Sequence, residues 1–404
     1  MNYQQQEMHE AQMDESVPLA GVRVLEFGHF AAGPFATMLL ADWGADVVKV
    51  EPPGGEPMRH WPPLVGDSGM SEGFGMNFAV LNRNKRCISL DLKDPEGLRQ
   101  AKDLCRGADI ILENFRPGVL ESLGLGYEEV LKLNPKVVYC SLTGYGQTGP
   151  LRDKGAFDVA IQAVSGVMSV TGEENGPPVK CGVALADYGT GVFAALSCVT
   201  ALRRAERTGK PGRIDVSMLS CMLSLANLQT SEYWGRGTVP KRLGSRHPKA
   251  SPYQAYLAAD GKWFILAAGS DRLWHRVCDV IGAPELVDDP RFKTAGTRAE
   301  NQVELEGVLA GIFSESSASV WLQKFDAAQV PAAPINDYAE ALASEHVQAT
   351  NLVHKMTLPD GNQVPTIGNP VSLSNYDFHI VHDPAASGMQ VGDVVAEWIG
   401  KGGR

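Results

Sequence analysis

A single carboxylate stands among small and apolar residues in the stretch VALADYGTG, residues 183–191. Asp187 in such a setting could attack an activated carbonyl group, because a carboxylate kept away from water is an effective nucleophile. The residues that follow, VFAALSCVTALRR, predict a helix that begins near Tyr188. Asp187 would then be the N-cap of this helix, and the local sequence favours that interpretation. Asp158 is a second acidic candidate, although its position is more typical of a helix start or a structural hydrogen bond.

The first predicted strand, VRVLEFG (22–28), leads into the turn GHFAAGP (28–34) and then into a helix. Backbone N–H groups and the helix dipole converge at such a turn, so it could bind a phosphate group. Glu51 ends the second predicted strand and could bind a ribose, but the G-x-G-x-x-G pattern of dinucleotide sites is missing. A nicotinamide site is therefore disfavoured, and a tight turn without a ligand stays an alternative.

Two later segments place polar side chains near predicted strands. LNRNKRCISLDLK (81–93) holds four cations: Arg83, Lys85, Arg86 and Lys93. They could bind phosphate groups, although a short basic run is more often a solvated surface. ENFRPG (113–118) puts an amide, an aromatic ring and a cation together at a strand end, where the ring and the cation could sandwich an adenine. A turn with a phenylalanine in the core explains that segment equally well.

Motifs for several other chemistries are absent from the sequence. The nine histidines show no H-E-x-x-H spacing, so we predict no metal site. No G-x-S-x-G elbow nominates a serine nucleophile. The seven cysteines form no C-x-x-C pair, and their scattered positions in apolar runs are typical of reduced, buried thiols.

The composition indicates a folded protein in the cytoplasm. Apolar residues make up 44% of the 404 residues and charged residues 21%. The net charge of -11 argues against general binding to nucleic acid or to anionic membranes. Residues 1–18 are polar and acidic, which predicts a flexible N-terminal extension rather than a signal peptide. No run approaches the roughly 18 consecutive apolar residues of a membrane span.

Strand-like and helix-like segments alternate from Val22 to about residue 142. This alternation predicts a parallel sheet built from right-handed βαβ units. A long apolar helix is expected at 219–234, and a loop rich in glycine, proline and basic residues at 235–253. The following segment, YQAYLAADGKWFILAA, predicts a hairpin around Asp260-Gly261. The fold class is therefore α/β, with a smaller α+β domain after about residue 240.

Several segments, in this order along the chain, carry a resemblance to one family. They include PLAGVRVLEFGHFAAGPFATMLLADWGADVVKVEPPGG, NRNKRCISLDLKDPEG, ENFRPGVLESLGLGYEEV, NPKVVYCSLTGYGQTGP, ALADYGTG and TGKPGRIDVSM. Together they resemble the class III CoA-transferase family, which includes carnitine and formyl–oxalate CoA-transferases and 2-methylacyl-CoA racemases. The resemblance covers about residues 18–385.

The resemblance implies a particular domain arrangement. A large Rossmann-like, CoA-binding domain with a parallel sheet would combine residues 19–225 and 331–404. Residues 226–330 would form a linker and the small domain. Two subunits would thread through each other to form an interlocked homodimer.

The resemblance also implies the residues of the active site. Asp187 matches the nucleophile of the family. Coenzyme A, as a substrate rather than a tightly bound cofactor, would be contacted by His29, Phe30, Ala31, Ala32, Leu90, Lys93, Asn114, Phe115, Arg116 and Phe157.

The chain departs from the family pattern at several positions. Ser122 stands where many members carry an arginine, so one phosphate contact would be lost or replaced by Arg116. The oxalate-specific branch has a glutamine at the position of Ala31 and a glycine run where this chain reads LGSRHPKASPY, which argues against formyl–oxalate specificity. The racemase branch has a histidine at the position of Phe157, so its proton-transfer pair would lack one partner.

We therefore expect a CoA-transferase that acts on small carboxylic acids through an aspartyl-CoA thioester. Arg246, His247 and Lys249 could bind the second carboxylate of a dicarboxylic acid. Backbone amides in GYG (144–146) could stabilise oxyanions, and the glycines after Asp187 would leave room for the substrate. The alternatives are a 2-methylacyl-CoA racemase and a non-catalytic acyl-CoA-binding protein.

Overall fold

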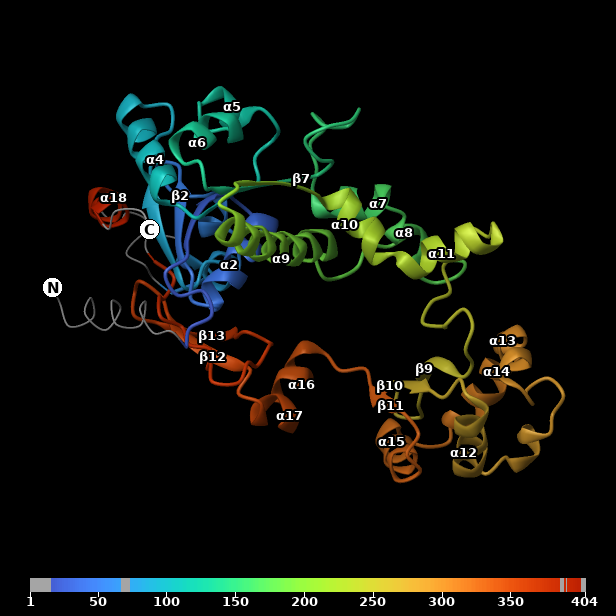
Figure 1. Cartoon of the computed structure of the whole chain (residues 1–404). Coiled ribbons are helices and arrows are strands. Elements are labelled where there is room, and N and C mark those ends of the chain that lie inside the picture. Colours follow the sequence, from blue (N-terminus) through green and yellow to red (C-terminus); the bar gives the residue numbers. More distant parts are fainter. Residues whose placement is uncertain (1–15, 67–72, 386–388, 390, 401–404) are drawn as a thin grey trace. The chain divides into compact units, whose positions relative to one another are not determined.

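The computed structural model describes residues 16–66, 73–385, 389 and 391–400 (Figure 1). The described residues form two compact units. The first unit contains residues up to Val167, Cys181–Ser231 and the chain from Gln348 onward. The second contains Met168–Lys180 and Glu232–Val347. Nearly all of the expected N-terminal extension, residues 1–18, lies outside the described residues.

The unit boundaries differ from those that the resemblance implied. The chain leaves the first unit after Ser231 rather than 225, and it returns at Gln348 rather than 331. The segment Met168–Lys180 belongs to the second unit although it lies between two segments of the first.

A six-stranded parallel sheet forms the centre of the first unit and confirms the predicted α/β class. Its strand order is β5-β2-β1-β6-β7-β8, and every neighbouring pair is parallel. The order reverses between β1 and β6, and ligands of open α/β sheets bind at the carboxyl ends of strands at such a point. The strands are β1 (Arg23–Phe27), β2 (Asp46–Glu51), β5 (Lys85–Ser89), β6 (Ile110–Glu113), β7 (Val138–Thr143) and β8 (Gly212–Ser217).

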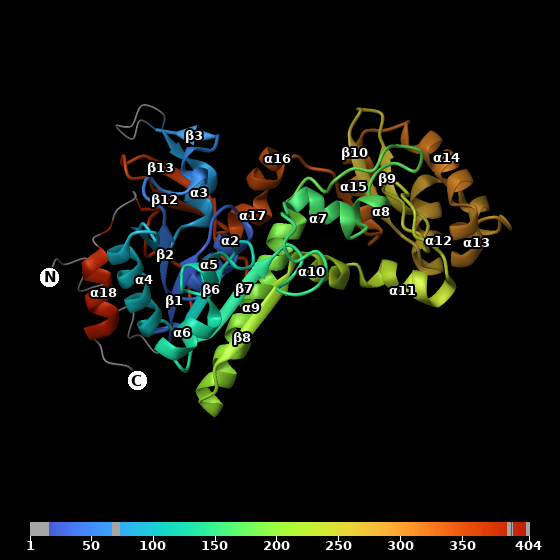
Figure 2. The same cartoon turned by 90° about the horizontal axis from the view of Figure 1, so that it is seen from above.

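Helices cover both faces of this sheet (Figure 2). Side chains alternate along each strand, so Val24 and Val138 pack toward α2 and α9, whereas Leu25 and Tyr139 pack toward α4 and α18. Most of the buried side chains on both faces of the central strands are apolar, as expected for a parallel sheet that is covered on both sides. The helices are α2 (Ala32–Asp42), α4 (Pro95–Gly107), α9 (Leu185–Thr208) and α18 (Val391–Gly400).

Helix α9 is long and apolar enough to cross a membrane by length and composition alone. Many residues of α9 are small and apolar, and they let this helix pack closely on α2. A Cβ atom at Gly191 would lie 2.8 Å from Phe35 Cδ1 and 3.0 Å from the carbonyl oxygen of Ala32. A core helix of a globular unit meets the same length and apolarity criterion.

The second unit contains a three-stranded antiparallel sheet in the order β11-β10-β9. The predicted hairpin around Asp260-Gly261 is confirmed, since β9 pairs with β10 across this turn. Phe264, Phe313 and Phe325 lie in the core, which is formed with the helices. The elements are β9 (Tyr253–Leu257), β10 (Trp263–Ala267), α12 (Asp271–Ile281), α13 (Ala295–Glu300), α14 (Gln302–Phe313), α15 (Ala318–Ala327) and β11 (Ala332–Pro334).

The C-terminal residues pack on the N-terminal half of the first unit. The hairpin of β12 and β13 places Met356 and Val364 against Met38 and Phe78. Trp398 Nε1 donates a hydrogen bond of 2.8 Å to Asp46 Oδ2. Residues from both ends of the chain therefore build this unit.

The long apolar helix that we expected at 219–234 is two helices, α10 (Met218–Leu225) and α11 (Asn227–Arg236). The remaining elements are short: β3 (Leu64–Val65), β4 (Phe74–Gly75), α3 (Met76–Leu81), α5 (Val119–Ser122), α6 (Tyr127–Leu133), α7 (Asp158–Val164), α8 (Val167–Val170), α16 (Tyr338–Ala343), α17 (Glu345–Ala349), β12 (Val353–Thr357) and β13 (Gln363–Ile367).

Candidate active site

A cavity of about 380 Å³ lies in the first unit, beside the carboxyl ends of β1, β6 and β7. Most of the predicted site residues line it, although they come from four distant segments: His29, Phe30, Ala31, Ala32, Asn114, Phe115, Arg116, Phe157 and Asp187. The reversal of strand order between β1 and β6 places the first two of these segments side by side.

Leu90 and Lys93 do not line this cavity. They follow β5, which is separated from β1 by β2. Leu90 is buried in the core beneath α4, and Lys93 is exposed to solvent. A contact between these residues and a nucleotide stays a prediction.

Asp187 occupies the first turn of α9 and is not its N-cap, so the interpretation that the local sequence favoured is wrong. The helix begins at Leu185, and the N-cap position belongs to Ala184, whose side chain offers no hydrogen bond. The Asp158 carboxylate supplies the missing acceptor, since its Oδ1 accepts a hydrogen bond of 2.8 Å from Ala186 N. A neighbouring helix thus supplies the group that satisfies a free N–H at the start of α9.

Burial and then the negative charge of Asp158 raise the pKa of Asp187 to about 6. A helix N-terminus favours a carboxylate, but here these two effects outweigh it. Asp187 is therefore ionised at neutral pH, while its carboxylate is more basic than that of an ordinary aspartate. Such a group combines the reactive protonation state with increased nucleophilicity.

The glycines after Asp187 serve helix packing rather than substrate access, which corrects our expectation. A Cβ atom at Gly189 would lie 3.0 Å from Leu225 Cδ1 and 3.1 Å from Met222 Cε, both on α10. Gly191 faces α2, as described above. Together they let α9 approach two helices closely.

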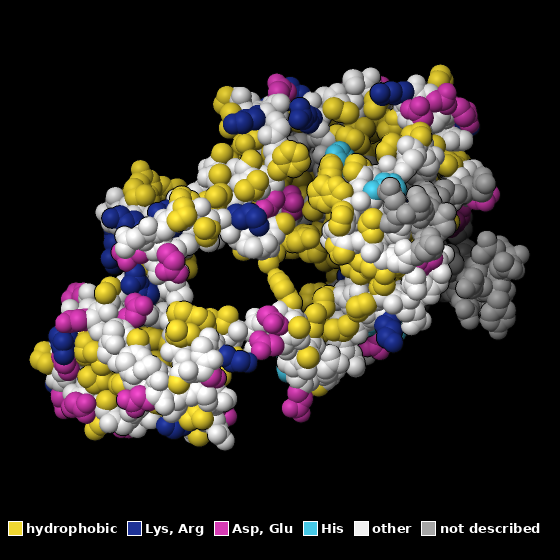
Figure 3. Space-filling model, turned by 180° about the vertical axis from the view of Figure 1, so that it is seen from behind, with side chains coloured by type: hydrophobic (Ala, Val, Ile, Leu, Met, Phe, Trp, Pro, Cys, Tyr) yellow, Lys and Arg dark blue, Asp and Glu magenta, His cyan; other side chains and the backbone are white. Residues whose placement is uncertain are grey.

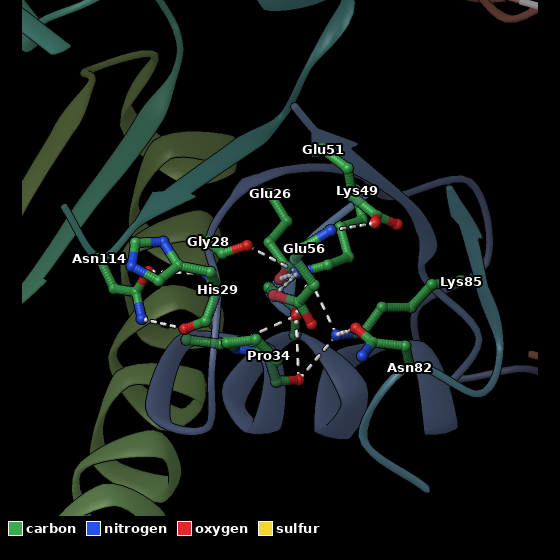
Figure 4. Close-up of polar contacts among 12 residues, drawn as sticks. Glu26, Gly28, His29, Pro34, Lys49, Glu51, Glu56, Asn82, Lys85 and Asn114 are labelled. Atoms are coloured by element: carbon green, nitrogen blue, oxygen red, sulfur yellow. Dashed lines mark hydrogen bonds and ion pairs between the residues drawn. The ribbon is translucent and has the colours of Figure 1, made fainter. Parts of the chain in front are cut away.

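The turn after β1 is held by side chains beneath it (Figure 4). Asn114 Oδ1 accepts a hydrogen bond of 3.0 Å from His29 N, and Asn114 Nδ2 donates one of 2.9 Å to the carbonyl oxygen of His29. Phe30, in the left-handed conformation with φ of 61°, donates its N–H to Glu56 Oε2 at 3.3 Å. We expected the backbone N–H groups of His29 and Phe30 to be available to a phosphate, but both already donate hydrogen bonds. The side-chain amide of Asn114 holds the turn in shape.

A buried charge cluster of Glu26, Lys49, Glu56 and Lys85 lies under this turn (Figure 4). Glu26 Oε1 lies 2.7 Å from Lys49 Nζ, and Glu26 Oε2 lies 2.9 Å from Lys85 Nζ. Burial alone would raise the pKa of Glu26, but the two lysine charges lower it to about 2. Lys49 Nζ also donates a hydrogen bond of 2.7 Å to the carbonyl oxygen of Gly28. The cluster connects the turn to the core of the sheet.

The predicted phosphate-binding group at 83–86 is wrong, as is its description as a solvated surface. Arg83 pairs with Asp42 at 2.6 Å and Arg86 with Asp46 at 2.5 Å, and both arginines are buried. Lys85 belongs to the buried charge cluster. The cations therefore neutralise buried carboxylates, which is the usual condition for a charge inside a protein.

Glu51 is equally unavailable for a ribose. Its carboxylate accepts hydrogen bonds of 2.6 and 2.7 Å from Arg59, and it is 1% exposed. This pairing removes the remaining signal for a nicotinamide site.

Three cations do line the cavity: Arg116, Arg152 and Lys154. Within residues 16–66, 73–385, 389 and 391–400, no carboxylate lies within 4.0 Å of their charged groups. Arg152 Nε is buried and has no hydrogen-bond partner among the described residues. The sequence reasoning missed Arg152 and Lys154, for which the signal was their position in GPLRDKGAF, shortly after a predicted strand end.

Ser122 provides no substitute for the arginine that many relatives carry. Its Oγ donates a hydrogen bond of 2.7 Å to the carbonyl oxygen of Val119 within α5. Arg116, which we expected to replace the lost contact, is exposed and lines the cavity.

The two other groups expected at the site have partners of their own. Gly146 N donates a hydrogen bond of 2.9 Å to Thr143 Oγ1, so this amide of the GYG segment is not free for an oxyanion. Within the second unit, Arg246 pairs with Glu174 and Glu306, and Lys249 pairs with Glu232. The His247 ring packs on Tyr253 with 5.1 Å between the ring centroids. Both cations are thus already neutralised, which counters our expectation of a free carboxylate-binding group.

No group of three or more His, Cys, Asp or Glu side chains in the described part of the chain is arranged to hold a metal ion. The cavity instead combines a basic carboxylate, flat aromatic rings and three cations that have no carboxylate partner among the described residues. This arrangement suits an anionic ligand with a planar group and an electrophilic centre.

Comparison with known proteins gives a consistent result. The model of CoA-transferase family III matches residues 19–390. A succinyl-CoA:glutarate CoA-transferase from Mus musculus is 36% identical over 386 residues, which are 95% of this chain and 87% of the relative. An acetyl-CoA:oxalate CoA-transferase from Acetobacter aceti is 40% identical over 362 residues, 89% of this chain and 90% of the relative.

A solved structure supports the same assignment. The crystal structure of a CAIB/BAIF family protein from Brucella suis superposes with a TM-score of 0.85 and 34% identity, covering 95% of this chain and 99% of that one. The chain belongs to the family III CoA-transferases, as the resemblance implied.

Proposed function

We propose that this protein transfers CoA from an acyl-CoA to a dicarboxylic acid through a thioester formed on Asp187. The observation that carries the proposal is the position of Asp187, which lines the same cavity as the segments 29–32 and 114–116. A thioester bound along those segments would have its carbonyl carbon near a basic carboxylate.

The reaction would have two halves, one with the donor acyl-CoA and one with the acceptor acid, and each half would consist of two acyl-transfer steps. The Asp187 carboxylate attacks the thioester carbonyl carbon, the C–S bond breaks, and CoA leaves as a thiolate from the resulting mixed anhydride. The thiolate then attacks the Asp187 carbonyl carbon, which releases the donor acid as a carboxylate and leaves the aspartyl-CoA thioester. The acceptor carboxylate repeats both steps in reverse. Covalent catalysis thus conserves the thioester and divides the exchange into easier steps.

The surroundings of Asp187 support these steps. Its first turn is partly buried, and no described residue donates a hydrogen bond to its carboxylate. Limited access of water protects the anhydride and the thioester from hydrolysis. Arg116, Arg152 and Lys154 supply positive charge for the phosphate groups of CoA and for a free carboxylate of the substrate.

The dicarboxylic acceptor is supported by the relatives. The two CoA-transferases described above are named for glutarate and oxalate, which both carry two carboxylates. Oxalate is the shorter of the two, so these names define a class of acceptor and a range of lengths. Arg116, Arg152 and Lys154 have no carboxylate partner among the described residues, so they are suited to the carboxylate that is not activated.

We further propose that the protein is a homodimer, interlocked as the resemblance implies. Hydrophobic side chains are exposed among charged ones on the surface (Figure 3). Val192, Leu196 and Val199 form one such stripe on α9, and Leu196 is 62% exposed. Their spacing puts them on one face of the helix, where a second subunit would remove them from water. Light scattering should give twice the mass of one chain, and a monomer across micromolar concentrations would refute this proposal.

The central experiment follows CoA exchange by mass spectrometry with a panel of acyl-CoA donors and acids. Incubation with the donor and hydroxylamine should convert one carboxylate into a hydroxamate, on the peptide that contains VALADYGTG. The Asp187→Asn variant should bind CoA but show neither exchange nor modification. Asp279→Asn, an exposed aspartate in α12, is the matched control. Exchange at a near-normal rate in Asp187→Asn would refute the assignment, and incorporation of solvent deuterium at the α-carbon without an acceptor acid would indicate a racemase.

A further inference from the structure

We propose that Gln162 is a positioning residue for the nucleophile: it holds the Asp158 carboxylate, which in turn fixes the first turn of α9. This inference rests on the proposed function. Gln162 does not line the cavity, so any effect on the reaction must pass through other residues.

Gln162 is fully buried on α7, and both ends of its side-chain amide are engaged. Its Nε2 donates a hydrogen bond of 2.7 Å to Asp158 Oδ2, and its Oε1 accepts one of 2.8 Å from Cys181 N. The other oxygen of Asp158 accepts a hydrogen bond of 2.8 Å from Ala186 N. One pair of side chains thus binds the segment that leads to Asp187 at both of its ends.

This double attachment matters because the start of α9 has no cap of its own. Ala184 has no side-chain acceptor, and the first N–H groups of a helix need partners from outside it. Asp158 provides one, but a carboxylate on a short helix can rotate about its side-chain bonds. The Gln162 amide fixes that rotation, since a buried amide with two good hydrogen bonds has little freedom to move.

The same contact sets the direction of a charge. Asp158 lines the cavity together with Asp187, and its charge disfavours the ionised form of Asp187. When Asp187 becomes a neutral anhydride or thioester, this repulsion disappears. Fixing Asp158 therefore favours the acylated states over free carboxylate. Among the described residues, the other charged or titratable side chains that line this cavity are His29, Arg116, Arg152 and Lys154.

A purely structural role would predict a different result. Asn134 offers the comparison, because its Nδ2 donates hydrogen bonds of 2.7 and 3.0 Å to the carbonyl oxygens of Ala108 and Cys105. It lies in the same unit and does not line the cavity. Loss of the Gln162 amide removes two hydrogen bonds, and loss of the Asn134 amide removes three, because Asn134 Oδ1 also accepts one of 3.3 Å from Lys136 N. Either loss lowers the stability of the fold.

The test compares Gln162→Leu, Gln162→Glu and Asn134→Leu in the full-length protein. Gln162→Leu should lower kcat about 10- to 100-fold at saturating substrate, with the KM for the acyl-CoA changed less than about 3-fold, because the nucleophile is misplaced while the binding residues are intact. Asn134→Leu should lower the melting temperature and leave kcat near the wild-type value. An equal fall of kcat in both variants, or no fall in Gln162→Leu, would overturn the proposal.

Gln162→Glu gives a readout that lost stability cannot imitate. The introduced carboxylate can accept from Cys181 N but cannot donate to Asp158 until it is protonated. Its kcat relative to the wild type should therefore rise as the pH falls from 8 to 5.5, whereas the ratio for Gln162→Leu should stay flat. A flat ratio for Gln162→Glu at every pH would contradict the proposed donor role.

The two proposals can fail separately. If the wild-type protein exchanges CoA with no acid and yields no hydroxamate at Asp187, the proposed function is refuted. If the wild type exchanges CoA normally and Gln162→Leu behaves as Asn134→Leu does, only the role of Gln162 is refuted.

Discussion

Replacement of Asp187 by asparagine should make the protein more stable as well as inactive. Asp187 has a pKa of about 6 in the folded chain, against an ordinary value of 3.8. Folding therefore disfavours its ionised form, and this difference corresponds to about 3 kcal/mol when the group is fully ionised. Asparagine has a similar shape and no charge, and no described residue donates a hydrogen bond that the Asp187 carboxylate would lose.

The pH dependence gives this prediction its sign and its range. Between the ordinary pKa and the raised one, the folded state binds more protons than the unfolded state, so wild-type stability falls as the pH rises. The cost is complete above about pH 7, about half as large at pH 5 and about a fifth as large at pH 4, and it vanishes below about pH 3. The advantage of Asp187→Asn should therefore be about 3 kcal/mol at pH 7.5, as an upper bound, and should shrink toward acid.

Chemical unfolding at pH 7.5, 6 and 5 measures this advantage directly, with near-ultraviolet circular dichroism as the signal. Asp279→Asn, a substitution of an exposed aspartate on α12, is again the control. The reasoning is refuted if Asp187→Asn is no more stable than the wild type at pH 7.5. A gain that is the same at pH 5 and pH 7.5 would refute it too, because a charge effect must follow the titration.

Three further predictions follow from the site and from the packing beneath it. Asp158→Asn removes a charge that raises the pKa of Asp187, so the acid limb of the pH profile of kcat/KM should move below about pH 6. The limb should stay above pH 3.8, because burial is the larger cause of the raised pKa. An unmoved limb would contradict this reasoning. Asn114→Ala removes two hydrogen bonds to the turn after β1 and should raise the KM for the acyl-CoA roughly 10-fold with a smaller change in kcat, measured by steady-state kinetics. Gly191→Ala should lower the free energy of unfolding by about 1–3 kcal/mol because α2 leaves no room for a methyl group. Gly307→Ala in α14, with nothing within 4 Å of the added atom, should instead leave stability equal or higher by up to about 1 kcal/mol, and equal effects of the two substitutions would refute the packing argument.

The sheet and its ligand-binding edge were predictable because their signals are local. The alternation of apolar strands and helices needs only a short window of sequence, and parallel strands align their carboxyl ends whatever their order. The grouping of His29, Phe115 and Asp187 around one cavity came from a resemblance that spans the whole chain. Periodicity alone could not have put these three residues together.

The pairing of charges was not predictable, since each partner is distant in sequence. Arg83 follows α3 and meets Asp42 at the end of α2, and Lys85 on β5 meets Glu26 on β1, two strands away. A run of cations looks the same in a sequence whether it binds phosphates, faces solvent or neutralises buried acids. Only the tertiary fold distinguishes the three.

The start of α9 was misplaced for a related reason. A short polar residue before an apolar run usually caps the helix, and Asp187 has that position. The true start lies at Leu185, because Asp158 on α7 satisfies the N–H of Ala186 from outside the segment. An acceptor that is 28 residues away leaves no mark in the local pattern.

The buried charge cluster under the turn has a consequence for the divergence of this family. Loss of Glu26, Lys49 or Lys85 alone would leave an uncompensated charge in the core, which typically costs about 3–5 kcal/mol. Single substitutions at these positions should therefore be removed by selection, while coordinated replacement of acid and base together survives. Across related sequences, the three positions should covary or remain fixed as a set, independently of which acid each enzyme accepts.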